Sequence, residues 1–299
     1  MKAMILAAGM GTRLRPLTDE KPKALVPVVG KPAILWNIEY LKRYGVTNII
    51  LNAHHHYEQI LEFFDKNSAL GVEIRVRVEP EILGTGGGIK NTEDFWDDES
   101  FIVLNGDILT NIPLDQAYAH HVDSGAPATM ILHDHPPFNK IRIDSRGPVK
   151  DIPRTYGTSG LAFTGIHILR PGLLNHLPGE VFSDIIDCYR GLIQAGETIQ
   201  SFVARDHYWY DIGTPDDYLR ANRDLSGKSI HTGPRAQVHP TARLEGWAVI
   251  GADCFIEEHA TVRRSILWDG ARVRKGEVIS DTVLTPLRAV KLKTASQGV

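Results

Sequence analysis

Glycines and cations are concentrated in one short stretch near the N-terminus. An apolar run over residues 3–6 leads into Gly9 and Gly11. Four cations follow within the next dozen residues: Arg13, Arg15, Lys21 and Lys23. Glycine lets backbone N–H groups approach an anion closely, because it has no Cβ and tolerates positive φ. A strand, a glycine turn and clustered cations form a cradle for a polyphosphate, so the stretch predicts binding of a nucleoside triphosphate.

The stretch matches neither of the commoner phosphate-binding motifs. Gly-x-Gly-x-x-Gly would need a third glycine where Leu14 stands, and the Walker sequence is absent. A tight turn with a solvated basic flank would explain an isolated Gly-x-Gly pair. Residues 9–18, Gly-Met-Gly-Thr-Arg-Leu-Arg-Pro-Leu-Thr, are followed by Pro-Lys-Ala-Leu-Val-Pro at residues 22–27. Together they resemble the signature of sugar-1-phosphate nucleotidylyltransferases.

The resemblance implies a reaction and roles for two of the cations. In that family a sugar 1-phosphate oxygen attacks the α-phosphorus of a nucleoside triphosphate and pyrophosphate leaves. Catalysis of such transfers is mostly positioning and charge neutralisation. By resemblance, Arg13 would neutralise the β- and γ-phosphates and Lys23 the transferred α-phosphate. Lys21 matches no family position and is expected to be solvated.

Two aspartates are expected to hold a divalent cation. The apolar run 103–105 ends in Gly106-Asp107, and Trp-Tyr-Asp-Ile-Gly-Thr-Pro occupies residues 209–215. Gly-Asp alone is typical of an ordinary turn, but both segments resemble the metal-binding elements of the family. Mg²⁺ prefers oxygen ligands, commonly one or two carboxylates plus phosphate oxygens. The resemblance therefore implies a Mg²⁺ site at Asp107 and Asp211.

The remaining site residues also follow from the resemblance. Residues 83–89, Leu-Gly-Thr-Gly-Gly-Gly-Ile, resemble the family loop that reads the nucleobase and are expected to precede a helix. The implied nucleotide contacts are Leu6, Ala8, Gly9, Gly11, Thr12, Glu81, Gly86 and Gly87. The implied sugar-phosphate contacts are Asn105, Lys150 and Thr164.

The chain departs from the family pattern in the expected sugar pocket. Residues 149–153, Val-Lys-Asp-Ile-Pro, are a loose match to the family's Glu-Lys-Pro, and Phe163-Thr164-Gly165 replaces its Asn-x-Gly. Both mannose-1-phosphate guanylyltransferases and N-acetylmuramate 1-phosphate uridylyltransferases resemble the chain, and thymidylyl transfer comes next. Transfer to a non-sugar phosphate such as phosphocholine remains open. A catalytically silent regulatory subunit is the alternative of a different class, although intact Arg13, Lys23, Asp107 and Asp211 argue against it.

The first 226 residues alternate strand-like and helical patterns. Strand-like, β-rich runs occupy residues 48–51, 73–78, 101–104, 128–132 and 165–169, and helical spacing of apolar residues occupies 33–44 and 57–64. This alternation predicts an α/β domain with a doubly wound, mostly parallel, Rossmann-like sheet of the nucleotide-diphospho-sugar transferase type. Ligands of such sheets gather at the carboxyl ends of strands, where the motifs fall.

Residues 227–299 have a different texture. Aliphatic residues recur every six positions from Val238 to Val262, with small apolar residues four positions after each. The pattern resembles the hexapeptide repeat and predicts a short left-handed β-helix over about residues 238–284. The phase is expected to continue to Trp268 and then to slip by one before Val273. So short a coil should pack on the catalytic domain or on another subunit, so a homo-oligomer is possible. Residues 287–299 are expected to form a loosely held tail.

Bulk composition excludes other partners. The 299 residues are 42% hydrophobic and 23% charged, with a net charge of -3, which provides no field for nucleic acid. Long apolar runs are absent from the sequence and Met1-Lys2 leads directly into the first expected strand, so neither a signal peptide nor a membrane span is expected. Cys188 and Cys254 are expected to be free thiols, and the expected location is cytoplasmic.

Overall fold

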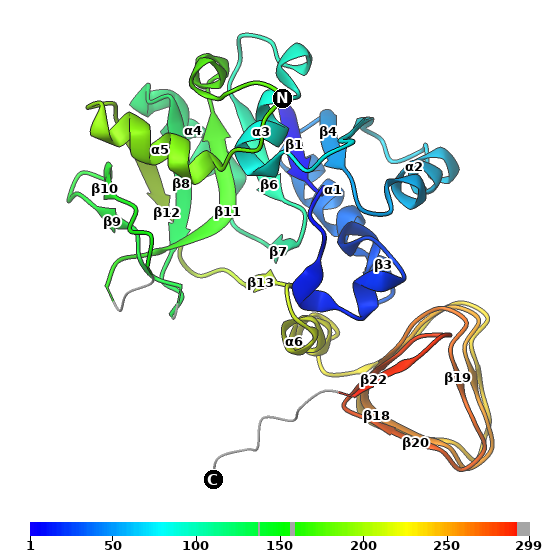
Figure 1. Ribbon diagram of the computed structural model, residues 1–299. Coiled ribbons are helices and arrows are strands. Elements are labelled where there is room, and N and C mark those ends of the chain that lie inside the picture. Colours follow the sequence, from blue (N-terminus) through cyan, green and yellow to red (C-terminus); the bar gives the residue numbers. More distant parts are fainter. Residues whose placement is uncertain (137, 156–158, 292–299) are drawn as a thin grey trace. The chain divides into compact units, whose positions relative to one another are not determined.

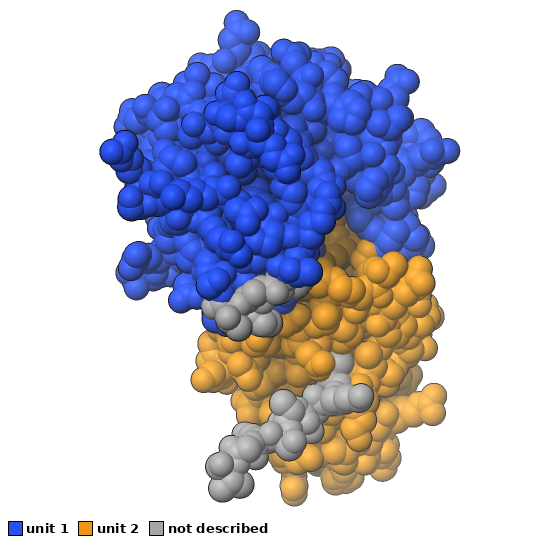
Figure 2. Space-filling model, turned by 60° about the vertical axis from the view of Figure 1, so that its left-hand side comes forward, with its two compact units in different colours: residues 1–10, 36–209 blue, residues 11–35, 210–299 orange. Residues whose placement is uncertain are grey.

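The structure is a computed structural model that describes residues 1–136, 138–155 and 159–291 (Figure 1). Its contacts divide the chain into two compact units (Figure 2). Unit 1 comprises Met1–Met10 and Trp36–Trp209, and unit 2 comprises Gly11–Leu35 with the described part of Tyr210–Val299. The glycine-rich signature therefore belongs with the C-terminal segment. Spatial contacts group the chain differently from the predicted division between residues 226 and 227.

Within the described residues, unit 1 contains a seven-stranded sheet in the order β12-β8-β11-β6-β1-β4-β5 (Figure 1). Strand β11 is antiparallel to both neighbours, whereas β5, β4, β1 and β6 pair in parallel, as do β8 and β12. The predicted mostly parallel sheet is thus confirmed. The strands are β1 (Lys2–Leu6), β4 (Asn48–Ala53), β5 (Glu73–Val78), β6 (Phe101–Asn105), β8 (Ala128–His133), β11 (Ala162–Leu169) and β12 (Ile199–Val203).

Helices and short elements connect these strands. The chain runs from β1 to β4 and β5 on one side and then returns to β6 on the other side of β1, so strand order reverses at β1. Ligands of open α/β sheets bind at such a reversal. The helices are α1 (Ala33–Arg43), α2 (Tyr57–Lys66), α3 (Gly84–Lys90), α4 (Leu114–Ser124) and α5 (Ile185–Gln194), with short helices η4 (Glu93–Phe95) and η5 (Pro171–His176). The short strands are β7 (Ile108–Thr110), β9 (Arg142–Ile143) and β10 (Val149–Asp151).

Unit 2 combines the signature segment with a coil of parallel strands. The signature segment contains η1 (Thr12–Leu14), η2 (Leu17–Asp19), η3 (Lys23–Leu25), β2 (Pro27–Val28) and β3 (Lys31–Pro32). The chain enters the unit again through β13 (Trp209–Asp211) and α6 (Pro215–Leu225). The coil contains β14 (Ile230–Thr232), β15 (Gln237–Val238), β16 (Arg243–Ile250), β17 (Phe255–Ile256), β18 (Thr261–Leu267), β19 (Arg272–Val273), β20 (Val278–Ser280), β21 (Thr282–Leu284) and β22 (Ala289–Lys291).

The coil is three-sided, and equivalent strands of successive turns stack in parallel (Figure 1). On one side Val238 pairs with Ile256, which pairs with Val273. Ile256 and Val273 are buried and contribute to a core that also contains Cys254, one of the two free cysteines. The aliphatic residues of the six-residue pattern therefore fill the interior of the coil.

The expected slip in this pattern was placed too late in the sequence. Ile250 pairs with Leu267 rather than Trp268, because the register between β16 and β18 already shifts after Glu245. At this bulge β16 carries one more residue than β18, and Arg264 adopts a positive φ of 46°. Leu267 consequently joins the coil interior, and Trp268 is buried outside it.

Helix α6 packs against both other parts of unit 2. The Tyr218 hydroxyl donates to the Pro27 carbonyl of β2 and accepts the indole N–H of Trp268 at 3.1 Å. The Asn222 side chain accepts the Val29 amide at 2.8 Å. These buried contacts explain why residues 11–35 and 210–225 group with the coil. No helix in the described ranges is long and apolar enough to cross a membrane.

Part of the predicted tail is ordered structure. Strand β22 pairs antiparallel with β21 and ends the coil, whereas residues 292–299 of the predicted tail lie outside the described residues. Sequence reasoning missed this hairpin because its strands are only three residues long each.

Buried histidines predict acid sensitivity of unit 1. Burial lowers the pKa of His121 and of His133 to about 4 and that of His167 to about 3, from an ordinary 6.5. As pH falls below 6.5, the unfolded chain takes up protons that the folded chain excludes. The contribution of these histidines to the free energy of unfolding is therefore fully present above pH 6.5 and is lost as the pH falls towards 4. Between pH 7.5 and pH 5 the free energy of unfolding should fall less in His121→Gln than in wild type, by up to about 2 kcal/mol. Urea unfolding at the two pH values measures this difference.

His176→Gln is the matched control for this experiment. His176 is exposed, and its replacement should leave the pH dependence of wild type unchanged. An equal loss of stability in wild type and His121→Gln would contradict the assignment of the acid sensitivity to this side chain.

Candidate active site

The N-terminal glycine turn is shaped by Gly11 and Thr18. Gly11 has a φ of 63°, and a Cβ there would lie 2.7 Å from Cγ2 of Thr18. The Thr18 hydroxyl donates to the Gly11 carbonyl at 2.8 Å and closes the loop. A Cβ at Gly9 would meet no described atom within 4 Å, so the backbone there faces open space. The loop thus has an approachable backbone on one side and a fixed turn on the other.

Arg13, Lys23 and Asp211 come together within unit 2. Nη2 of Arg13 lies 3.4 Å from Oδ2 of Asp211, and Nζ of Lys23 lies 3.6 Å from Oδ1. The Arg13 side chain is 61% exposed, whereas that of Lys23 is 14% exposed. One carboxylate is therefore flanked by an exposed guanidinium and a largely buried ammonium.

Gly213 and Thr214 position Asp211 against Arg13. A Cβ at Gly213 would lie 2.9 Å from the guanidinium carbon of Arg13 and 2.8 Å from Oδ1 of Asp211, so any larger residue would have to displace these two side chains. The Thr214 side chain accepts the Asp217 amide at 3.2 Å and caps α6, whose first residue is Pro215. The Gly-Thr-Pro part of the motif thus ends the strand and begins the helix immediately after the aspartate.

Asp107 lies in unit 1, directly after β6. The Gly106 amide donates to the Leu6 carbonyl at 2.9 Å, and the Asn37 side chain donates to the Gly106 carbonyl at 3.0 Å. These bonds hold the Gly-Asp turn beside the end of β1. Asp107 is half-buried at the carboxyl edge of the sheet, as the sequence predicts.

Asn52 and Glu79 connect two segments of the candidate site, and sequence reasoning missed them. The Asn52 side chain accepts the Ala7 amide at 2.7 Å and donates to Glu79 at 2.8 Å. Glu79 in turn accepts the Leu83 amide at 3.2 Å. Burial raises the pKa of Glu79, although these hydrogen bonds oppose the shift. This chain of bonds connects the loop after β1 with the start of α3. The available signal was a polar residue at the carboxyl end of each of two strand-like runs.

The nucleobase element differs from the expectation. Gly86 and Gly87 lie inside helix α3 rather than in a loop before it, and both are buried. The Gly86 amide donates to the Ser183 carbonyl at 2.8 Å, so the small residues let α3 approach the segment before α5. Glu81 is exposed, and Glu79 occupies the buried position that connects the strands.

The expected sugar-phosphate residues are in three different environments. Asn105 ends β6 and pairs in register with Leu6, so it lies at the site edge of the sheet. Thr164 is fully buried, and its hydroxyl donates to the Ile131 carbonyl at 2.8 Å. Lys150 lies on the β9–β10 hairpin, with Nζ 3.2 Å from a carboxylate oxygen of Asp144. The hydroxyl of Thr164 thus stabilises the sheet, and its contact with the sugar phosphate stays a prediction.

Main-chain positions complete the predicted nucleotide contacts. Leu6 is the last residue of β1, and Ala8 lies in the segment that follows this strand within unit 1. Thr12 begins η1 in unit 2, and its carbonyl accepts the Arg15 amide at 3.3 Å.

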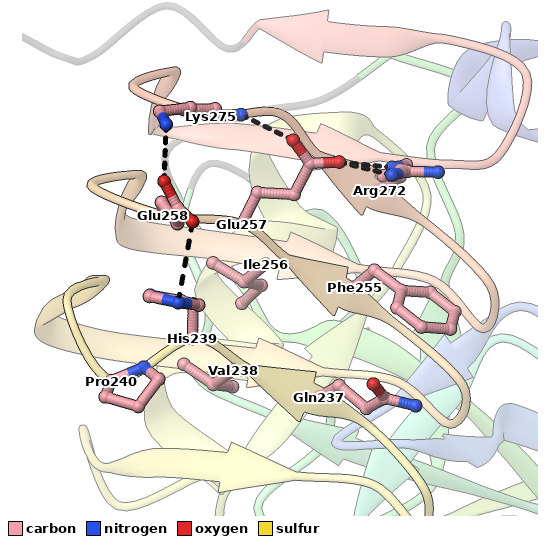
Figure 3. A pocket seen from close by; sticks show the side chains of 10 residues that line it. All are labelled: Gln237, Val238, His239, Pro240, Phe255, Ile256, Glu257, Glu258, Arg272 and Lys275. Carbon is pink, nitrogen blue, oxygen red and sulfur yellow. Dashed lines mark hydrogen bonds and ion pairs between the residues drawn. The ribbon is translucent and has the colours of Figure 1, made fainter.

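A hollow on one face of the coil is lined by paired charges of both signs (Figure 3). It has a volume of about 520 Å³ and lies over β15, β17 and β19. Arg272 donates to Glu257 at 2.6 Å, Lys275 pairs with Glu258, and His239 lies 3.9 Å from Glu258. These charges neutralise one another along the stacked turns, so we do not assign a phosphate site here.

Comparison with known proteins identifies the family. The model of the nucleotidyl transferase family matches residues 2–228. N-acetylmuramate alpha-1-phosphate uridylyltransferase of Neisseria meningitidis serogroup B is 36% identical over 72% of this chain and 94% of its own length. Mannose-1-phosphate guanylyltransferase 1 of Arabidopsis thaliana is 31% identical over 95% of this chain and 86% of its own length.

A solved structure supports the fold. UDP-glucose pyrophosphorylase complexed with UDP-glucose superposes with a TM-score of 0.66 at 22% identity, over 76% of this chain and 99% of the other. The family model covers the glycine turn, both aspartate motifs and the seven-stranded sheet. The chain therefore belongs to the nucleotidyl transferase family.

Proposed function

We propose that the chain transfers a nucleotidyl group from a nucleoside triphosphate to a sugar 1-phosphate and releases pyrophosphate. The observation that carries the proposal is the cluster of Arg13, Lys23 and Asp211, which joins the glycine turn to the second aspartate motif. Relatives along most of the chain are named as uridylyl and guanylyl transferases. Guanylyl or uridylyl transfer to a hexose-like 1-phosphate, of the mannose or N-acetylmuramate type, is accordingly the proposed reaction.

Charge neutralisation by the two cations is the proposed contribution of the cluster. An oxygen of the sugar phosphate forms a bond to the α-phosphorus, and the bond from this phosphorus to the bridging oxygen breaks. Negative charge moves onto the departing pyrophosphate. Exposed Arg13 would follow the β- and γ-phosphates, and Lys23, held in a more buried position, would contact the α-phosphate.

A divalent cation, proposed to be Mg²⁺, would be held by Asp107 and Asp211, the aspartates of the two family motifs. No group of three or more His, Cys, Asp or Glu in the described residues has the arrangement of a complete metal site. Two carboxylates with phosphate oxygens as the other ligands suit Mg²⁺. Bound there, the ion would neutralise charge on the phosphates. This assignment rests on the family motif to which each aspartate belongs.

Contacts with the two substrates are proposed for the remaining residues of the family motifs. The backbone at Leu6, Ala8, Gly9, Gly11 and Thr12 would face the nucleotide. Asn105 and the ammonium of Lys150 would contact the sugar phosphate, while Glu81, Gly86 and Gly87 stay the proposed nucleobase contacts.

We infer that the coil is a left-handed β-helix of the hexapeptide type. The parallel stacking of its strands and the aliphatic interior support this assignment. Phe255 and Val278 are 43% and 61% exposed on the coil. Association of two copies through the coil is the corresponding proposal for the assembly, and sedimentation of the full chain would test it.

A substrate matrix tests the proposed function. Four nucleoside triphosphates are combined with a panel of sugar 1-phosphates and phosphocholine, and pyrophosphate release is measured with Mg²⁺. We expect turnover with GTP or UTP and a hexose-like 1-phosphate. Turnover by the purified chain alone would exclude a silent regulatory subunit. Nucleotide-sugar binding without turnover in any combination would support that alternative and reject the proposal.

A further inference from the structure

The backbone that carries Lys23 has little structure of its own. Lys23 begins η3, and η2 ends four residues earlier at Asp19. Each of these 3₁₀ helices has three residues, and such short turns have poor hydrogen-bond geometry. The position of the Lys23 ammonium therefore depends on contacts that the connecting residues make with other segments.

The connecting residue Glu20 is held by the end of the coil. Its side chain is 10% exposed. The carboxylate accepts Nε–H of Arg288 at 2.8 Å and the hydroxyl of Thr285 at 3.1 Å. Nη1 of Arg288 also lies 3.6 Å from Oδ2 of Asp19. One guanidinium thus contacts two successive carboxylates of the signature segment. Glu20 and Thr285, which meet here, are 265 residues apart in the sequence.

Thr285 and Arg288 form a hydrogen-bonded turn between β21 and β22. The Thr285 amide donates to the Arg288 carbonyl at 2.8 Å, and the Arg288 amide donates to the Thr285 hydroxyl at 3.1 Å. Strand β21 pairs with β18, so the turn is anchored on the coil. Both partners of Glu20 belong to one turn. Together they hold the Glu20 carboxylate in one orientation and at one distance from the coil.

A second contact reaches the segment from the coil. Nζ of Lys21 lies 6.0 Å from the centre of the Trp268 ring, within the range of a cation–π interaction. The ring is oriented by the hydrogen bond from its indole N–H to Tyr218. Lys21 was expected to be solvated, and this contact shows that it also packs against the coil.

We propose that the C-terminal coil positions Lys23 for catalysis through a brace made by Glu20, Thr285 and Arg288. In this arrangement Glu20 and Arg288 are positioning residues that act through Lys23. The inference rests on the proposed role of Lys23 in nucleotidyl transfer. Displacement of a catalytic group by about 1 Å can cost as much as 100-fold in rate, so a brace remote from the substrate can control turnover.

A double-mutant cycle on the full chain tests the brace. We expect Arg288→Ala to lower kcat by about 10-fold. In a Lys23→Ala background the same change should lower the residual kcat by less than about 2-fold, because the group through which it acts is gone. Arg288→Lys should recover part of the loss, since it can still donate to Glu20. Arg235→Ala is the control: Arg235 forms an ion pair with Asp253 on the coil and should stay within about 2-fold of wild type.

The outcomes separate the brace from the proposed function. Wild-type kcat in Arg288→Ala, or the same fractional loss in both backgrounds, would overturn the brace. If Arg288→Ala melts at a lower temperature than Arg235→Ala, Glu20→Gln replaces it in the cycle, because it keeps the side-chain shape and removes the charge. Inactivity of the wild type with every substrate pair would instead reject the proposed function.

Discussion

Arg13→Ala is expected to lower kcat by on the order of 100-fold or more, because it removes a cation at the phosphates where charge develops. Arg13 lies in the glycine turn and is 61% exposed, so it can move with the leaving pyrophosphate. Its loss should reduce kcat more than it raises KM for the triphosphate, since the interaction strengthens as the bond breaks. Steady-state pyrophosphate release measures both parameters.

Arg220→Ala is the matched control for this change. Arg220 is 51% exposed and pairs with Asp217 on helix α6, so it shares the residue type, exposure and kind of partner. We expect it to keep wild-type turnover. A kcat of Arg13→Ala within a few-fold of the control would remove Arg13 from the proposed mechanism.

Asp211→Asn is expected to separate nucleotide binding from turnover. The substitution removes a carboxylate between two cations, so the metal-free triphosphate should bind more tightly to the variant. At the same time the proposed Mg²⁺ site loses a charged ligand. Turnover at saturating Mg²⁺ should therefore fall by on the order of 100-fold or more. Calorimetric titration with and without a chelator measures binding, and pyrophosphate release measures turnover.

Asp216→Asn makes the same change of charge at an exposed position of α6. It should leave both measurements close to wild type. If Asp211→Asn bound the metal-free triphosphate more weakly than this control, the carboxylate would have a role other than the one proposed.

Much of the sheet was predictable because its strands are β-rich runs of ordinary length, some apolar throughout and some alternating apolar with charged residues. The predicted runs 73–78 and 48–51 correspond to β5 and to most of β4. The antiparallel direction of β11 was not predictable, because an apolar run has the same pattern in either direction. The helix at Gly84–Lys90 was also missed, since glycine has a low helix propensity and this helix forms through its packing.

The site was predictable only in part for a related reason. Arg13 and Asp211 are 198 residues apart, and no local pattern relates two such positions. The resemblance to a family predicted their association, and in the structure Lys23 also lies beside Asp211. Asn52 and Glu79 went unnoticed because their importance comes from hydrogen bonds between neighbouring strands. The inward hydroxyl of Thr164 could not be foreseen from its place in a motif.

The packing of α6 has a consequence for how this architecture can be divided or recombined. One side of the helix is buried against the coil through Tyr218 and Trp268, and Asn222 holds the segment at Val29. A gene truncated after the helix would leave an aromatic surface without its cover and Glu20 without its guanidinium. A chimaera made by exchanging domains must therefore take the helix, the signature segment and the terminal hairpin from the same parent protein.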